Sequence, residues 1–314
     1  MPDAGIGIAP GRAQARPGHA GRTRGAAFRG TAHAFLYLAP AALIYLGFAV
    51  WPALNTAGLS FFEWDGILPP VWVGIENYVD VFQKPLLLKS LGNSFVLIIF
   101  FCIIPIVLGL IMTGLLMGYA RRGLTFFRVV YFLPQVLPMV VVGITWRWMY
   151  AEDGLLNQGL RLIGLDAITR VWLGDFSFAL VALGFVGTWC LAGLCMMLFL
   201  SGAQHIDMSL YEAATLDGAG AFRKFISVTL PGIRGEVTIA SVICTIAALT
   251  SFDLVFMTTD GGPANQTVIP GLLVYRLAFK EGEIGTSAAL AVTLTVLVIL
   301  VIAVIRRIAK ERDE

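Results

Sequence analysis

Long runs without charged residues dominate the chain, and short polar segments separate them. The longest runs lie between Arg29 and Glu63, between Lys89 and Arg121, and from Phe176 to Ile206. A helix that crosses a bilayer needs about 20 mostly apolar residues, because its backbone must satisfy its own hydrogen bonds in lipid. The pattern therefore predicts six spans, at about residues 34–59, 93–118, 129–149, 177–201, 237–257 and 284–305.

The composition fits an all-α integral membrane protein. Of 314 residues, 58% are hydrophobic and 13% are charged, whereas soluble domains have roughly a quarter of charged residues. The cysteines all fall in apolar runs, which favours small core residues over a disulfide framework. The three histidines show no metal-ligand spacing. We expect no metal site and no nucleic-acid partner.

Basic residues indicate the orientation of the spans. The N-terminal segment, the second and fourth connections and the C-terminal segment together hold fifteen of the 22 Lys and Arg residues. Basic residues close to spans are retained in the cytoplasm. Both termini are therefore predicted to be cytoplasmic.

The chain is predicted to have three parts. Residues 1–30 are rich in Gly, Ala, Pro and Arg and contain no apolar signal-peptide core, so they are predicted to be a disordered basic tail. Residues 31–306 form the six-span domain, and residues 307–314 form a cytoplasmic tail.

The connection between the fourth and fifth spans, residues 205–234, differs from the other connections. Ser209 followed by Glu212 has the spacing of a capping box, and Asp207 is an alternative cap. Gly218 and Gly220 would end this first helix, and a second short helix would follow from Phe222 to Val228. The sequence predicts a helical hairpin at the membrane surface.

The hairpin has the chemistry of a docking surface. Its alanines and glycine would let a partner backbone approach closely, and Glu212 and Asp217 would face a basic partner surface. The alternative is an amphipathic hairpin that packs under its own spans.

This hairpin resembles the EAA loop of the membrane-spanning subunits of binding-protein-dependent ABC importers, and more narrowly those of the maltose/multiple-sugar type. The resemblance rests on Glu212-Ala213-Ala214, Asp217-Gly218-Ala219, Phe225 and Leu230-Pro231. Other similar segments are 73–78, Phe127-Arg128, Gly154–Asn157, Phe252-Asp253 and Gly261–Pro263. Two features depart from the family pattern: Asp207 stands where a proline is usual, and the first external loop is short.

The resemblance implies a type I importer permease in the bacterial cytoplasmic membrane. It would pair with a second homologous permease subunit, two ATP-binding subunits and an extracytoplasmic solute-binding protein, and would conduct a carbohydrate. The residues implied in coupling to the ATPase are Glu212, Ala213, Ala214, Asp217, Gly218 and Phe225. ATP and Mg would bind to the partner subunits, since this chain has no Gly-x-x-x-x-Gly-Lys motif and is not expected to be an enzyme.

Some polar and aromatic residues within the spans are candidates for the substrate pathway, because sugars offer apolar faces and many hydroxyls. They are Gln135, Trp146, Thr188, Trp189 and Asp253. Three of them have a structural alternative: an aromatic belt for Trp146, an interhelical hydrogen bond for Gln135, and an Arg147 or backbone partner for Asp253.

Two other functions compete with a sugar importer. An importer of glycerol-phosphate compounds or phosphodiesters would share the same hairpin. A secondary carrier would place ionisable residues at the midplane and show inverted repeats, whereas these spans are nearly free of charge.

Overall fold

The computed structural model describes residues 37–116 and 124–310, and the chain divides into two compact units, Met1–Leu54 and Asn55–Glu314. The predicted basic tail, residues 1–30, lies outside the described residues, as do the last two residues of the predicted second span.

The first long helix runs from Tyr37 to Leu59 and has 23 residues. It includes a π-helical turn, η1 (Leu46–Val50), and continues as α2 (Trp51–Leu59). Large apolar side chains such as Tyr37 and Phe48 are exposed along it. A helix of this length with an apolar surface is suited to contact with lipid.

Four long helices of the second unit give it its framework. A continuous helix from Pro85 to Leu116 combines α4 (Pro85–Ile98), η2 (Ile99–Ile103) and α5 (Ile104–Leu116). The others are α9 (Ala179–Ala203), α13 (Arg234–Leu249) and α16 (Ile284–Lys310), which continues past the predicted end at residue 305. Helix α9 is central, since it packs against α5, α6 (Leu124–Val136) and α13.

Glycines bring the neighbours of α9 unusually close. A Cβ at Gly193 would lie 2.3 Å from the carbonyl oxygen of Tyr131 on α6, and one at Gly187 would lie 2.0 Å from the ring of Phe101 on η2. The facing helix also contributes a glycine: a Cβ at Gly109 on α5 would lie 2.7 Å from the Cβ of Cys195 on α9. Small residues at helix contacts permit dense packing between apolar helices in a membrane.

Proline explains three of the π-helical turns in the described chain. Pro52, Pro105 and Pro231 each stand two residues after such a turn, namely η1, η2 and η4 (Phe225–Thr229). Because proline has no N–H, the helix loses one regular hydrogen bond and its ladder is locally rearranged. The helices continue past Pro52 and Pro105, to Leu59 and Leu116, whereas the segment with Pro231 ends one residue later, at Gly232.

The predicted third span, residues 129–149, is not one straight helix. Thr125–Val136 and α7 (Met139–Met149) meet at a bend of 99°. Pro138 lies at the break, with ψ of 132°, and caps α7. A proline disfavours helical geometry in the residue before it and supplies no N–H, so the chain turns here.

The predicted fifth span, residues 237–257, is also divided. Helix α13 ends at Leu249, and α14 (Asp253–Thr258) is a separate short helix packed against α7. The helical segment Ala221–Gly232 meets α13 at 70°. The described chain thus has four helices long and apolar enough to cross a membrane, or up to six if each bent pair is one span.

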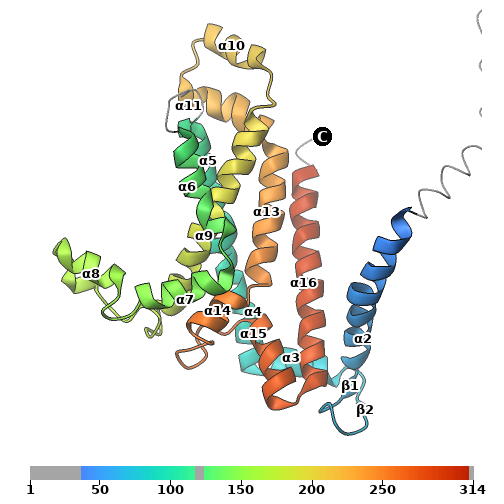
Figure 1. The fold of residues 1–314 in the computed structure, drawn as a ribbon. Helices are drawn as coiled ribbons and strands as arrows, with labels where there is room; N and C mark the ends of the chain where they lie inside the picture. Colours follow the sequence, from blue (N-terminus) through green and yellow to red (C-terminus); the bar gives the residue numbers. More distant parts are fainter. Residues whose placement is uncertain (1–36, 117–123, 311–314) are drawn as a thin grey trace, which may run out of the picture. The chain divides into compact units, whose positions relative to one another are not determined.

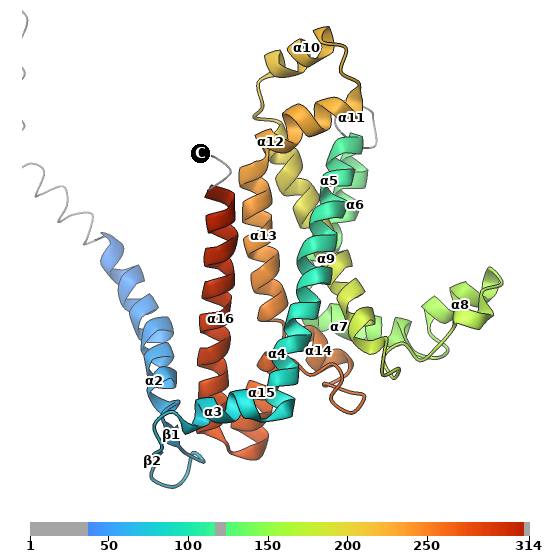
Figure 2. The same cartoon turned by 180° about the vertical axis from the view of Figure 1, so that it is seen from behind.

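Short elements lie between the long helices of the second unit. They are the antiparallel pair β1 (Phe62–Glu63) and β2 (Val71–Trp72), α3 (Glu76–Gln83), α8 (Leu155–Leu162), η3 (Asp166–Ile168), α15 (Pro270–Arg276) and η5 (Leu277–Glu281). Figures 1 and 2 show α3, α14 and α15 at one end of α9 and α13, and the hairpin helices α10 and α11 at the other.

The glycine contacts lead to a test of stability. Gly193→Ala should destabilise the second unit by about 1–3 kcal/mol, because the new methyl group meets backbone on α6 that has no room to move. Thermal unfolding in detergent should show a fall in Tm on the order of 2–10 °C. Gly92→Ala is the matched control, since nothing lies within 4 Å of its Cβ position on α4. An equal Tm for both variants would contradict the packing argument.

Candidate functional site

The hairpin comprises residues 205–234, and its first arm is α10 (Met208–Leu216). The carboxylate of Asp207 accepts a hydrogen bond of 2.9 Å from the backbone N–H of Ser209. Asp207 is therefore the N-cap, and the predicted cap at Ser209 is wrong. This hydrogen bond also lowers the pKa of Asp207, because it stabilises the charged carboxylate.

A tight turn at Gly218 ends α10. Gly218 has φ of +73°, the left-handed conformation that side chains disfavour. Its N–H donates to the carbonyl of Thr215, and the N–H of Ala219 donates to that of Ala214. This is the Schellman pattern that ends many helices, so the predicted role of Gly218 in a turn agrees with its geometry.

The second arm is one helical segment that turns into the membrane bundle. It consists of α11 (Ala221–Lys224), η4 and α12 (Leu230–Gly232), and it leads directly to α13. The predicted second helix, Phe222–Val228, falls within this segment.

Helix α10 stands clear of the bundle, and none of its residues is buried. Glu212, Ala213, Asp217 and Gly218 are exposed, and Ala214 is half-buried. Leu216 is 89% exposed. Exposed apolar and acidic groups on one short helix have the character of a protein-docking surface.

Phe225 belongs to a different surface. A Cβ on Gly114 of α5 would lie 3.3 Å from its ring, so Phe225 faces the bundle. Together with Tyr211 and Lys224 it lines a cavity of about 720 Å³ between the two arms of the hairpin and the ends of α5 and α9. Phe225 is placed to hold the second arm to the bundle, which differs from the contact with a partner that the motif implied.

The structure brings together two of the five candidate pathway residues. Trp146 on α7 and Trp189 on α9 contact each other edge to face, with 5.5 Å between ring centroids. Trp189 is 42% exposed, while Trp146 also contacts Tyr150. The pair offers a partly open aromatic surface.

The remaining candidates lie apart from this pair or are engaged elsewhere. Thr188 is buried, and its hydroxyl donates a 2.6 Å hydrogen bond to the carbonyl of Phe100. Gln135 is half-buried one residue before the end of α6. Asp253 is exposed at the first position of α14, and no ion pair to Arg147 is present in the described residues.

Asn157 organises the segment from Ala151 to Gly174 and explains the Gly154–Asn157 motif. It is fully buried; its amide nitrogen donates to the carbonyls of Glu152 and Arg170, and its amide oxygen accepts from the indole of Trp172. A Cβ at Gly154 would lie 2.4 Å from the carbonyl oxygen of Met149. The motif therefore has a structural role: it holds the loop backbone around Asn157 in place.

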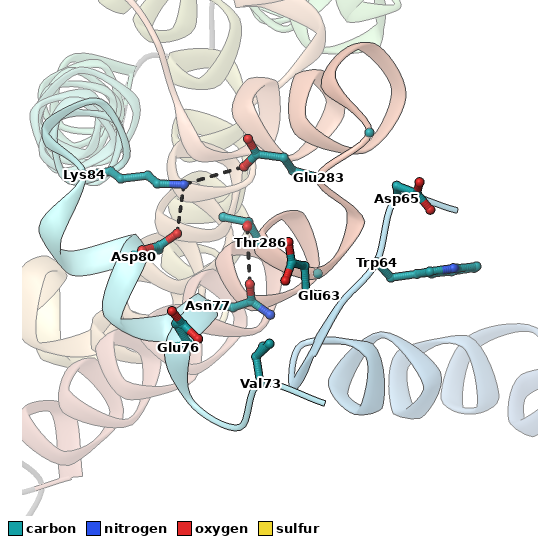
Figure 3. Close-up of a pocket in the computed structure, with 12 residues that line it drawn as sticks. Glu63, Trp64, Asp65, Val73, Glu76, Asn77, Asp80, Lys84, Glu283 and Thr286 are labelled. Atoms are coloured by element: carbon teal, nitrogen blue, oxygen red, sulfur yellow. Dashed lines mark hydrogen bonds and ion pairs between the residues drawn. The ribbon is translucent and has the colours of Figure 1, made fainter. Parts of the chain in front are cut away.

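An acidic pocket of about 320 Å³ was not found by sequence reasoning (Figure 3). Four of its carboxylates come from the segment 63–80 (Glu63, Asp65, Glu76 and Asp80), and the fifth, Glu283, comes from a distant part of the sequence. Lys84 lies 2.9 Å from Asp80 and 3.6 Å from Glu283. The hydrogen bond with Asp80 raises the pKa of Lys84, because it favours the ammonium form.

The pocket joins the segment that follows the first long helix to the start of α16. Asn77 donates to the carbonyls of Ser60 and Phe62, and Thr286 of α16 donates to the Asn77 side-chain oxygen at 3.4 Å. Within the described ranges, no group of three or more His, Cys, Asp and Glu side chains could hold a metal ion.

Comparisons with known proteins agree with this geometry. Residues 105–313 match the family described as "Binding-protein-dependent transport system inner membrane component". The chain is 35% identical to the probable ABC transporter permease protein YurN of Bacillus subtilis, over 86% of this chain and 92% of the relative. The chain belongs to this family of inner-membrane transport components.

A second relative and a solved structure also resemble this permease. It is 35% identical to the diacetylchitobiose uptake system permease protein NgcF of Streptomyces coelicolor, over 83% of this chain and 78% of the relative. A crystal structure of a bacterial ABC transporter involved in alginate import has a chain with the same fold, with a TM-score of 0.76, 20% identity, and coverage of 91% and 98%. The predicted all-helical importer fold is confirmed.

Membership of this family establishes the general activity of the permease. It is a multi-pass inner-membrane subunit of an ABC transporter complex that works with a solute-binding protein, and it is not itself catalytic. In this family, ATP hydrolysis resides on partner subunits.

The role of Asn157 can be tested by hydrogen exchange. Asn157→Ala removes the buried amide from several backbone partners, so amides of residues 151–174 should exchange roughly tenfold faster or more. Gln158→Ala is the control, because that exposed side chain makes one hydrogen bond, to the carbonyl of Asp153. Unchanged exchange in Asn157→Ala would show that the amide does not hold the segment.

Proposed function

We propose that this permease forms half of the membrane pathway of an ATP-driven carbohydrate importer, and that the hairpin couples it to an ATPase subunit. The observation that carries the proposal is the exposure of α10. It presents Glu212, Ala213 and Leu216 to solvent, with no buried residue of its own. A partner that docks there would bury apolar area and pair with the acidic groups.

A carbohydrate substrate is supported by the relatives. Similar permeases are described as serving diacetylchitobiose uptake, lactose transport and multiple-sugar transport. The multiple-sugar relative, from Streptococcus mutans, is 34% identical over 82% of this chain and 88% of its own length. The partly exposed pair Trp146 and Trp189 suits the apolar face of a sugar ring.

The complex would contain a second homologous permease, two ATP-binding subunits and an extracytoplasmic binding protein. Both termini would be cytoplasmic, as the distribution of Lys and Arg indicates. The hairpin would then face the cytoplasm, on the side where ATP is available.

The mechanism follows from this placement. Closure of the ATP-binding subunits would move two docked α10 helices together. The second arm of the hairpin continues into α13 at a 70° bend, so movement of α10 would reach the bundle through that arm. The spans would then change from an inward-facing to an outward-facing arrangement and receive sugar.

A pair of glycines gives a sharp test of the coupling. Gly218→Ala places a side chain at φ +73°, which costs about 1–2 kcal/mol and distorts the end of α10. Sugar uptake by the assembled transporter in vesicles should fall, while the amount of permease in the membrane stays unchanged. Gly218→Asp should have the larger effect, because it adds charge to the docking surface.

Gly220→Ala is the matched control. Neither glycine has an atom within 4 Å of its Cβ position, but Gly220 has an ordinary negative φ of −69°. Normal uptake by Gly218→Asp at a normal level of protein would contradict the coupling role of the hairpin.

The aromatic pair can be tested independently. If Trp189 offers its face to sugar, Trp189→Ala should raise the KM for uptake about two- to tenfold through loss of the aromatic contact. Trp148→Ala is the control, because Trp148 lies on α7 and is 74% exposed. The same KM for Trp189→Ala and the unmodified protein would remove Trp189 from the pathway.

A further inference from the structure

Helix α10 has no buried residue and contacts η4 of the second arm. In the described part of the chain, the phenol of Tyr211 makes the side-chain hydrogen bond that joins α10 to the second arm of the hairpin. Its oxygen lies 3.0 Å from the hydroxyl oxygen of Thr229. Tyr211 is half-buried, although its neighbours Leu210 and Glu212 are exposed.

Thr229 is a firm anchor for this bond. It is 1% exposed at the end of η4, and its carbonyl accepts a hydrogen bond from the N–H of Ile233, which is itself fully buried. Helix α13 begins at Arg234, directly after Ile233. A force applied to Thr229 therefore acts close to the start of a long membrane helix.

Apolar packing does not replace the bond. Tyr211 and Thr229 both line the cavity of about 720 Å³ between the arms of the hairpin. Because α10 has no fully buried residue, its packing on the second arm is shallow, and the Tyr211–Thr229 hydrogen bond is a direct side-chain link between the two arms. Without that bond, the cavity leaves room for α10 to tilt.

We propose that Tyr211 and Thr229 form a strut that transmits movement of α10 to the second arm and to α13. Tyr211 is a positioning residue in this role, since it acts through Thr229 and not on substrate. The inference rests on the proposed coupling function of the hairpin. It adds that docking and transmission use different residues, with Glu212 facing the partner and Tyr211 facing inward.

The strut predicts a change in coupling without a loss of docking. In the complete transporter with its binding protein, reconstituted in vesicles, Tyr211→Phe and Thr229→Val should each lower the sugar transported per ATP hydrolysed about three- to tenfold, the range expected for loss of one hydrogen bond. The double variant should be no worse than either single variant, because both remove the same bond. Thr229→Ser keeps the hydroxyl and should preserve the ratio.

Two further measurements separate this role from a general loss of structure. A cysteine introduced by Ala213→Cys should crosslink to the ATP-binding subunit equally well with and without Tyr211→Phe. Ser227→Ala is the matched control for hydroxyl loss in the same arm, because the Ser227 hydroxyl bonds to the carbonyl of Arg223 within its own helix. It should leave the transport ratio unchanged.

The outcomes also distinguish the strut from the coupling function itself. If Ala213→Cys crosslinks and the transport ratio of Tyr211→Phe equals that of the unmodified transporter, the strut is excluded while the docking surface stands. If Ala213→Cys reaches no ATP-binding subunit in the otherwise unmodified transporter, the proposed coupling function fails and the strut fails with it. A lowered ratio with intact crosslinking supports both.

Discussion

Close contact between α9 and its neighbours is the constraint on which the rest of the second unit depends. In lipid, burial of apolar side chains between helices gains little, since the solvent is equally apolar. The helices must therefore gain dispersion energy from dense packing. Gly187, Gly193 and Gly109 permit that packing, because at each position the neighbouring chain occupies the space that a side chain would take.

Proline has different effects at different positions in these helices. At Pro52 and Pro105 a π-helical turn absorbs the missing hydrogen bond and the helix continues, whereas after Pro231 the helix ends at Gly232. At Pro138 the chain instead turns sharply, and α7 leaves the direction of α6. That turn brings Trp146 of α7 to Trp189 of α9, so the partly open aromatic pair is a consequence of the bend.

The hairpin combines an exposed first arm with an anchored second arm. Helix α10 leaves Glu212 and Leu216 exposed, whereas Phe225 of the second arm faces Gly114 of α5 and Thr229 is buried. The proposed docking needs this division, since a helix that packed firmly on its own spans would have no surface left for another protein. Beside the cavity between the arms, the hydrogen bond between Tyr211 and Thr229 joins one arm to the other, and the proposed strut depends on it.

The sequence by itself determined the membrane class, the places of the apolar segments and the hairpin with its glycine turn, because these depend on local composition and on residues a few positions apart. Only the tertiary structure decided where the third and fifth apolar segments divide, that Phe225 faces inward, and that the Thr188 hydroxyl is engaged by Phe100. The acidic pocket likewise required Glu63 and Glu283 to meet. Contacts between residues so distant in sequence arise from packing, which no local pattern records.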